Sequence, residues 1–166
     1  AALPPNRVPI PLVRSGDRIG EPCFRCDPEK IVAIVETDRP DRNAGFTIPG
    51  ADDLAIAGHL LEFLEHEVKK GRLPPSLLPL QSGVGNTANA VLTGLIEAPF
   101  ENLTAYTEVI QDGMMALLDS GKLRMASSTA LSLSPDLSES VNRRMGGYRD
   151  RIILRSQEIS NHPELI

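Results

Sequence analysis

The feature that most constrains the fold is a regular alternation of short apolar segments and helix-length segments after Gly71. The expected strands lie at 77–81, 103–106, 122–126 and 151–154, and the expected helices lie at 87–95, 112–119 and 135–145. Strands that alternate with helices form βαβ units, in which parallel strands are covered by the helices that connect them. The sequence therefore predicts an α/β fold with an open, mostly parallel sheet and flanking helices.

A longer helix is expected before this alternation. Apolar residues recur every four positions from Ile56 to Val68, which indicates an amphipathic helix. Asp52 or Asp53 is suitable as its N-cap, and Gly71 is suitable as its end.

The first part of the chain is different in character. Residues 1–30 are rich in proline and have no sustained period, which is typical of a connecting segment. The β-branched run 31–35 predicts one buried strand. We therefore divide the chain into a proline-rich connector with one strand over residues 1–47 and an α/β region over 48–166. Both ends look cut, because a helix beginning at Pro163 has no room to finish, so we expect a piece of a larger protein.

Charge and hydropathy exclude several classes of protein. The 166 residues include 17 Lys and Arg against 22 Asp and Glu, a formal net charge of −5 without a basic cluster. This is not the electrostatic pattern of a nucleic-acid binder. No apolar run approaches the roughly 20 residues that span a bilayer, so no membrane partner is expected. We expect a cytoplasmic protein.

The cysteines and histidines do not indicate a metal site. Cys23 and Cys26 form a lone Cys-x-x-Cys motif, and the nearest histidines, His59 and His66, lie more than 30 residues further on. A zinc site needs further ligands at short spacing, so no metal is expected. We interpret the two cysteines as reduced thiols in a loop.

Two features are candidates for chemistry, and the expected topology places them together. A glycine-rich loop, Ser82–Thr87, lies between a strand and a helix, and Glu108 follows the next strand. Parallel strands end at the same edge of a sheet, so the loop and the carboxylate are expected to be neighbours. Three interpretations remain open on these residues. The loop and Glu108 form a dinucleotide site, or they are only structural, or Glu108 is a nucleophile and the loop amides stabilise an oxyanion.

Several longer motifs carry a family resemblance. They are Gly16–Gly20, Cys26–Glu36, Ile56–His59, Leu80–Val91, Leu103–Gly113 and Leu154–Asn161. In this order they resemble the acetyl-CoA hydrolase/transferase family of class I CoA-transferases, which includes succinyl-CoA:acetate CoA-transferases. The resemblance implies that residues 48–166 are the first half of the C-terminal α/β domain of a longer enzyme.

The resemblance also implies roles for single residues. Glu108 matches the family's catalytic glutamate, which forms a glutamyl-CoA thioester. The CoA-binding loop corresponds to Gly83, Val84, Gly85, Asn86 and Thr87, and the backbone N–H of Val84 corresponds to an oxyanion donor. The implied activity is CoA transfer between a short-chain acyl-CoA and a small carboxylate of the acetate or succinate type, or hydrolysis of acetyl-CoA. CoA is then a substrate and no cofactor is bound permanently, and the expected assembly of the full-length protein is a homodimer.

Overall fold

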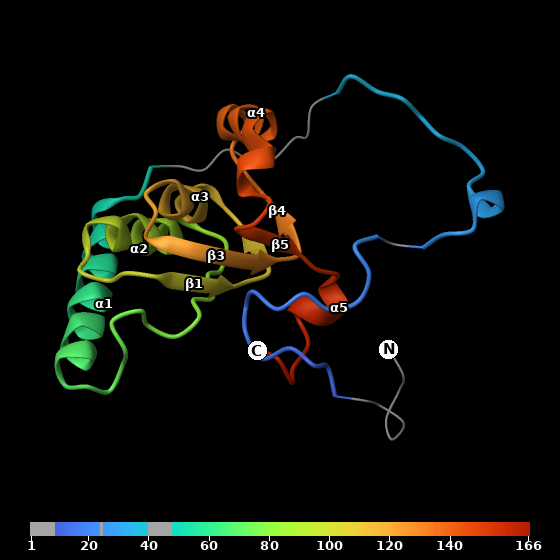
Figure 1. The fold of residues 1–166 in the computed structure, drawn as a ribbon. Helices are drawn as coiled ribbons and strands as arrows, with labels where there is room; N and C mark the ends of the chain where they lie inside the picture. Colours follow the sequence, from blue (N-terminus) through green and yellow to red (C-terminus); the bar gives the residue numbers. More distant parts are fainter. Residues whose placement is uncertain (1–8, 24, 40–47) are drawn as a thin grey trace.

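The computed structural model describes residues 9–23, 25–39 and 48–166, and Figure 1 shows their arrangement. The helices are α1 (Ala51–Lys69), α2 (Asn86–Glu97), α3 (Asp112–Asp119), α4 (Pro135–Arg144) and α5 (Gln157–Ser160), with short 3-10 turns at Pro28–Lys30 and Met145–Tyr148. The strands are β1 (Leu103–Tyr106), β2 (Val109–Ile110), β3 (Leu123–Ser128), β4 (Ala130–Leu131) and β5 (Ile152–Leu154). Part of the expected connector, residues 1–8, 24 and 40–47, lies outside the described residues.

The strands form two small parallel sheets. The larger has the order β1-β3-β5, and the smaller pairs β2 with β4. The expected α/β class with parallel strands is therefore confirmed. The strand expected at 77–81 is reduced to one bridge, in which Leu80 pairs with Ala105. Pro79 precedes it and has no backbone N–H to donate, which limits a longer ladder here.

Helices α1, α2 and α3 are stacked on one face of the larger sheet. Figure 1 shows α3 over β3, α2 beside α3, and α1 packed outside α2. Leu103 and Ala105 of β1 are fully buried, as are Leu117 and Leu118 of α3, because apolar residues on these elements meet in one core. Helices α2 and α3 are close to the predicted ranges, since their apolar residues recur with the helical period.

The two-residue strands β2 and β4 were not predicted from the sequence. They follow β1 and β3 after a break, with Val109 opposite Ala130 and Ile110 opposite Leu131. The break on the first side consists of Thr107 and Glu108. Glu108 therefore lies between two strands and is held from both sides by paired backbone.

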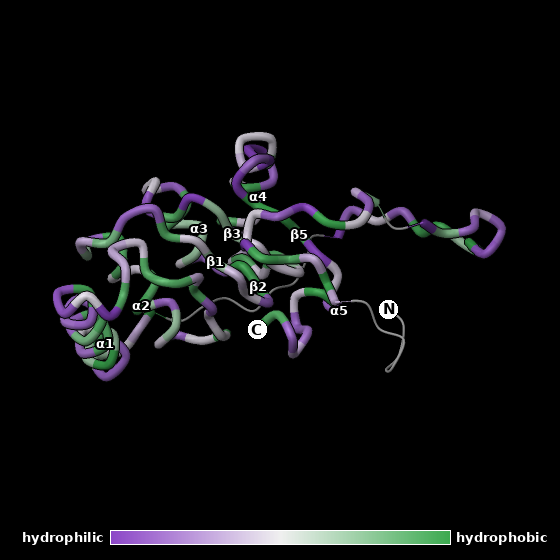
Figure 2. The backbone as a smooth tube through the Cα atoms, turned by 60° about the horizontal axis from the view of Figure 1, so that its bottom comes forward, coloured by the Kyte–Doolittle hydropathy of each residue, from purple (hydrophilic) through white to green (hydrophobic). Residues whose placement is uncertain are grey.

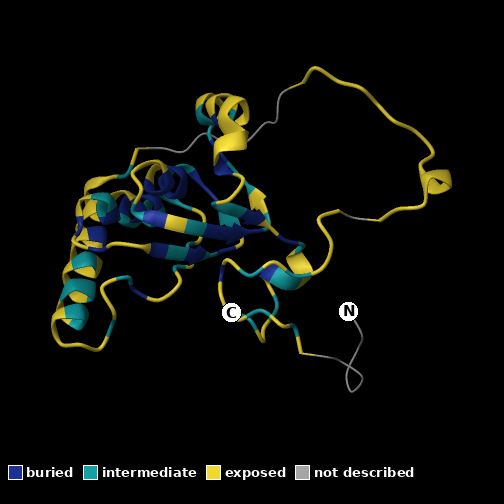
Figure 3. Cartoon of the chain, in the orientation of Figure 1, coloured by how far each residue is buried: buried dark blue, intermediate teal, exposed yellow. Residues whose placement is uncertain are grey.

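The buried strand predicted at 31–35 is wrong. Residues 31–39 form no regular secondary structure, and Val32 and Val35 are 97% and 84% exposed. Figure 1 shows this part of the chain as an arc away from the sheet, and Figures 2 and 3 show it as partly apolar and exposed. A strand needs a neighbour for its N–H and C=O groups, and no strand among the described residues lies beside this run.

The helix predicted to begin at Pro163 is also wrong. The last helix is α5, which begins at Gln157 and so starts before Pro163, and residues 161–166 form turns. The carbonyl of Ser156 accepts the N–H groups of Ile159 and Ser160, which starts the helix earlier than the proline signal indicated. The predicted N-cap of the long helix α1 is also wrong. Gly50 is its N-cap in place of Asp52 or Asp53, and the Asp53 carboxylate accepts the Gly50 N–H at 2.9 Å.

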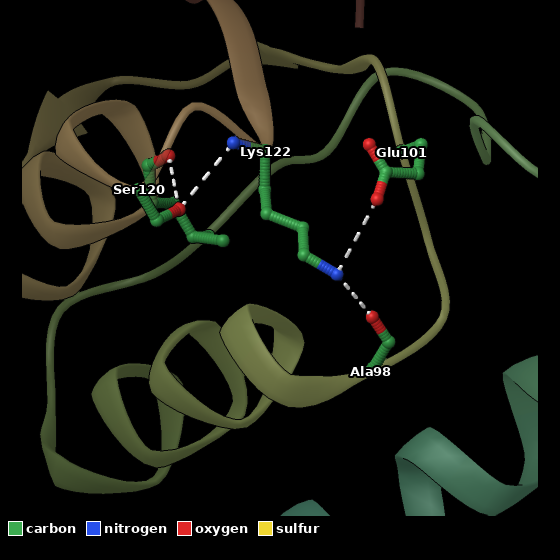
Figure 4. Close-up of polar contacts among 5 residues, drawn as sticks. Ala98, Glu101, Ser120 and Lys122 are labelled. Atoms are coloured by element: carbon green, nitrogen blue, oxygen red, sulfur yellow. Dashed lines mark hydrogen bonds and ion pairs between the residues drawn. The ribbon is translucent and has the colours of Figure 1, made fainter.

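Polar contacts also hold the edge of the sheet where β1 and β3 begin. Figure 4 shows Lys122, whose ammonium group donates to the carbonyl of Ala98 at 2.6 Å and lies 3.8 Å from the carboxylate of Glu101. The backbone N–H of Lys122 donates to the Ser120 hydroxyl at 3.3 Å. These contacts join the turn after α2 to the turn before β3.

Within the described residues, no helix has the length and apolar composition needed to cross a bilayer.

Candidate functional site

The glycine-rich loop lies between the Leu80 bridge and the start of α2. Gly85 is the N-cap of α2 and has φ 146° and ψ 171°, a conformation that is almost restricted to glycine. Gly83 has no such requirement, and a Cβ there would meet no atom within 4 Å. The side chain of Val84 is 72% exposed. The loop therefore presents its backbone to solvent at a helix N-terminus, a place that favours anions and oxyanions.

Glu108 lies just after the end of β1 and before β2. Its backbone carbonyl accepts the Thr129 N–H at 2.9 Å and the Ser128 hydroxyl at 2.7 Å. Its side chain is exposed, and its Oε1 accepts a hydrogen bond from Gln157 Nε2 at 3.2 Å. The backbone of Glu108 is therefore fixed by the end of β3, while its carboxylate is accessible to a reactant.

Thr107 joins the loop to the segment that carries Glu108. It is 1% exposed, and its hydroxyl donates to the Ser82 carbonyl at 2.9 Å while its N–H donates to the Ser127 carbonyl at 2.9 Å. The residue next to Glu108 therefore contacts the first residue of the glycine-rich loop. No hydrogen bond in the described part of the chain joins the Glu108 side chain itself to residues 83–87.

Asp53 is a second contact to the loop that the sequence did not indicate. Its carboxylate accepts the hydroxyl of Thr87 and the N–H of Gly50. The Thr87 hydroxyl and then the Gly50 N–H lower the pKa of Asp53 below its usual value. Asp53 thus links the start of α1 to the start of α2, and it accepts the hydroxyl of Thr87, a residue that the family resemblance assigned to the CoA-binding loop.

The helices behind the two candidate features are in close contact. Asn89 of α2 accepts the N–H of Gly113 of α3 at 3.3 Å. A Cβ at Gly113 would lie 3.0 Å from both Asn89 Oδ1 and Leu92 Cβ. Only glycine fits there without a shift, so the α2–α3 contact sets how the loop lies relative to Glu108.

Several buried side-chain polar atoms have no hydrogen-bond partner among the described residues. They are the side-chain oxygen and nitrogen of Gln111, the hydroxyl of Thr129 and the hydroxyl of Ser160. Buried polar groups are normally hydrogen-bonded, because leaving them unpaired costs free energy. Gln111, Thr129 and Ser160 therefore carry buried hydrogen-bonding groups that the described residues do not pair.

The last helix is fastened to the other face of the larger sheet. The Tyr106 hydroxyl donates to the Ile159 carbonyl at 2.7 Å, and burial raises the pKa of this phenol. The buried Arg155 donates to the Ser127 hydroxyl at 2.7 Å and to the carbonyl of Ser15 at 3.1 Å. These bonds position Gln157, which the sequence did not single out. The available signal was that β5 ends at the same edge as β1.

A cavity of about 810 Å³ lies elsewhere, near the beginnings of the strands. Its lining includes Asn102 before β1, Gly121 before β3 and Asp150 before β5, together with Arg14 and Asp17 of the first segment. Ligands of parallel sheets bind at the carboxyl ends of the strands. We therefore place the candidate site at Glu108 and the loop and not in this cavity.

The residues considered for metal binding do not come together. Cys23 and Cys26 are free and exposed, and His59 lies on α1, 3.8 Å from the carboxylate of Glu62. In the described ranges, no three His, Cys, Asp or Glu side chains are grouped as a metal site would require.

Comparison with known proteins adds the family. The chain is 49% identical over 164 residues to an acetyl-CoA hydrolase of Neurospora crassa and 48% identical over 162 residues to a succinyl-CoA:acetate CoA-transferase of Clostridium kluyveri. These matches cover 99% and 98% of this chain and 31% and 30% of the relatives. The chain belongs to the family of acetyl-CoA hydrolases and CoA-transferases. No model in a scan of protein-family models matches it.

Solved structures agree with the family in fold. RipA of Yersinia pestis matches with a TM-score of 0.63 at 20% identity, over 80% of this chain and 29% of that one. A 4-hydroxybutyrate CoA-transferase of Porphyromonas gingivalis matches with a TM-score of 0.52 at 21% identity, over 73% of this chain and 30% of that one. The chain thus spans about a third of the length of its CoA-transferase and hydrolase relatives.

Proposed function

We propose that the full-length protein transfers CoA between a short-chain acyl-CoA and a small carboxylate such as acetate or succinate, with Glu108 as the nucleophile. The observation that carries this proposal is the identity of 48–49% to an acetyl-CoA hydrolase and a succinyl-CoA:acetate CoA-transferase. The contact of Thr107 with Ser82 supports it, because it brings the segment of Glu108 against the loop that would bind CoA. The same similarity favours this interpretation over a dinucleotide-binding domain.

The first step would join the enzyme to the acyl group. A Glu108 carboxylate oxygen attacks the thioester carbonyl, the carbon–sulfur bond breaks, and the products are an acyl-glutamyl anhydride and CoA thiolate. The thiolate then attacks the glutamyl carbonyl and releases the acyl group as a free carboxylate, which leaves a glutamyl-CoA thioester. A second carboxylate reverses these steps, so the thioester bond is conserved.

The loop would supply binding and charge stabilisation. Residues 83–87 would hold CoA, and the backbone N–H of Val84 would donate to the oxygen that becomes negative. A carboxylate is a weak nucleophile, so positioning and prearranged donors must provide most of the acceleration. CoA acts here as a substrate, and no permanently bound cofactor is proposed.

Hydrolysis of acetyl-CoA is the second candidate activity. The relatives named acetyl-CoA hydrolase include proteins of Neurospora crassa and Schizosaccharomyces pombe, at 49% and 48% identity. In this case water attacks the glutamyl-CoA thioester in place of the second carboxylate. We further propose a cytoplasmic homodimer of the full-length protein, in which residues 48–166 form the first half of the C-terminal domain.

The test is covalent labelling of the full-length protein. Incubation with acetyl-CoA followed by peptide mass spectrometry should show a CoA adduct on the peptide that contains Glu108. Glu108→Ala should remove the adduct and abolish transfer, because no other group forms the anhydride. Glu139→Ala is the matched control, since this glutamate lies on the surface of α4 with a 70% exposed side chain. Absence of an adduct from the unaltered protein would refute the proposal and favour a structural role for this region.

A further inference from the structure

Two of the motifs that carry the family resemblance lie against each other, although they are distant in the sequence. They are Gly16–Gly20 in the first segment and Leu154–Asn161 at the end of β5. Arg155 makes the contact, because its Nη2 donates to the carbonyl of Asp17 and, at 3.1 Å, to the carbonyl of Ser15. The proposed chemistry does not involve this contact, so it needs an explanation of its own.

The guanidinium group of Arg155 is buried and bonded to three oxygen atoms. Arg155 is 8% exposed, and besides the two carbonyls its Nε donates to the Ser127 hydroxyl at 2.7 Å. None of the three acceptors is a carboxylate. A buried charge is tolerated where hydrogen bonds replace its contacts with water. The position of the guanidinium and the positions of its acceptors therefore depend on each other.

The two carbonyl acceptors belong to a turn, residues 13–17, that is ordered by its own hydrogen bonds. The Asp17 carboxylate accepts the N–H of Val13 at 3.0 Å and the N–H of Arg14 at 2.8 Å. The Asp17 N–H donates to the Arg14 carbonyl at 3.0 Å, and Ser15 is 7% exposed. The turn therefore presents its carbonyls to Arg155 in a fixed arrangement.

Arg155 is also joined to the end of β3, which holds the segment of the candidate nucleophile. Besides the bond to Ser127, its backbone N–H donates to the Ser128 carbonyl at 2.7 Å. The Ser127 carbonyl accepts the Thr107 N–H at 2.9 Å. The Ser128 hydroxyl donates to the Glu108 carbonyl at 2.7 Å. Ser128 alone therefore links Arg155 to the backbone of Glu108.

We propose that Arg155 is a positioning residue for Glu108, which makes catalysis depend on the contact between the turn 13–17 and the end of β3. This inference rests on the proposed function. The guanidinium acts through Ser127 and Ser128 and not on the reacting atoms. It restricts the backbone from which the carboxylate reaches the thioester carbonyl. A misplacement of about 1 Å at a reacting group can cost about 100-fold in rate.

An arginine suits this position because one planar group donates to three acceptors from different parts of the chain. A lysine carries the same charge, but its single ammonium nitrogen does not reproduce the fork of donors. Arg155→Lys therefore retains the charge and loses the arrangement, which makes it the variant that tests positioning.

The experiment follows thioester formation on Glu108 in the full-length protein. Acetyl-CoA is the substrate, the reaction is stopped by rapid quenching, and the adduct is measured by peptide mass spectrometry. KM for acetyl-CoA and the folded fraction, from circular dichroism, are measured in parallel. The test variants are Arg155→Lys and Asp17→Asn, of which the second weakens the turn from a site outside the reaction.

Two further variants separate positioning from stability. Arg155→Ala is assayed with and without added methylguanidinium ion, which has the donors that the variant lacks. Arg143→Lys is the matched control, because Arg143 lies on the surface of α4 with a 75% exposed side chain.

Arg155→Lys is expected to slow thioester formation about 10- to 100-fold, because Glu108 is no longer held in place. KM should change less than about twofold, since the contact of Asp53 with the glycine-rich loop is retained. Asp17→Asn should slow the step about 2- to 10-fold. Methylguanidinium should speed Arg155→Ala at least about threefold by restoring charge-assisted bonds. Arg143→Lys should behave like the unaltered protein.

The outcomes separate this inference from the proposed function. An unaltered rate in folded Arg155→Lys overturns the role of Arg155 alone. A rate that falls only in proportion to the folded fraction, without recovery in methylguanidinium, assigns the arginine to stability and also overturns its role. No adduct in the unaltered protein overturns the proposed function and this inference with it. If neither variant of Arg155 folds, Asp17→Asn decides, and an unaltered rate in that variant contradicts the inference.

Discussion

The run 31–35 and strand β1 were both predicted to be strands, and the structure gives them opposite surroundings. Four of the five residues in the run are β-branched, while β1 has Thr104 as its single β-branched residue. Yet Val32 is 97% exposed, and Leu103 in β1 is fully buried. The intrinsic preference for a strand, as indicated by β-branched residues, is therefore higher in the segment that forms no strand.

The difference lies in what surrounds each segment. β1 has β3 on one side and the Leu80 bridge on the other, and helices cover one of its faces. These neighbours satisfy its backbone groups and remove its apolar side chains from water. The run 31–35 has no such neighbours among the described residues, so its preference alone does not produce a strand.

The sharpest test of this comparison is truncation of one residue in each segment. Leu103→Ala should lower the free energy of unfolding by about 2–5 kcal/mol, because it leaves a cavity in the core. Val32→Ala is the matched control and should change it by less than about 0.5 kcal/mol, since the side chain is almost fully in water. Urea unfolding followed by circular dichroism measures both. Equal losses for the two variants would break the comparison.

A second, smaller effect tests close packing inside the α/β body. Gly113→Ala should destabilise the protein by about 1–3 kcal/mol, because the new methyl group is pressed against Asn89 and Leu92. Gly58→Ala on α1 meets no atom within 4 Å and should stabilise the helix by about 0.5–1 kcal/mol. Thermal unfolding midpoints that move in the same direction for both variants would contradict this explanation.

The smallest expected effect concerns the joint between α1 and α2. The pKa of Asp53 is lowered in the folded protein, so its contribution is present above the usual pKa of 3.8 and is lost as pH falls through the lower folded value. The unaltered protein should therefore lose more stability between pH 7 and pH 3 than Asp53→Asn does. Urea unfolding at the two pH values measures this difference.

Asp52→Asn is the control for that experiment. Asp52 is adjacent and exposed, and its side chain makes no hydrogen bond among the described residues. It should retain the acid dependence of the unaltered protein. If both variants lose the dependence equally, the contacts of Asp53 with Thr87 and Gly50 are not its source.

Helices and strands that are long enough to show a repeating pattern of apolar residues were predictable from the sequence. β1 and α3 have the predicted bounds, and α2 differs by one or two residues, which is the usual uncertainty of helix ends. β2 and β4 were not predictable, because two residues carry no period. The helix predicted at Pro163 was wrong, because a proline is favourable at the start of a helix but does not show that a helix forms.

The candidate site was predictable in part. Glu108 and the glycine-rich loop were assigned to one edge because both follow parallel strands. The Thr107 contact that links their segments agrees with that assignment. Gln157 and Asp53 were not found, because each reaches the site through a contact between elements distant in the sequence.

The amino-acid sequence by itself determined the α/β class, the order of the main elements and the candidate nucleophile, because these depend on local periodicity and on motif residues. Only the tertiary structure decided that the run 31–35 stays unpaired and that Gln157 lies against Glu108. Pairing and long-range hydrogen bonds need a partner at a definite place in space. Local sequence carries no information about where the folded chain brings that partner.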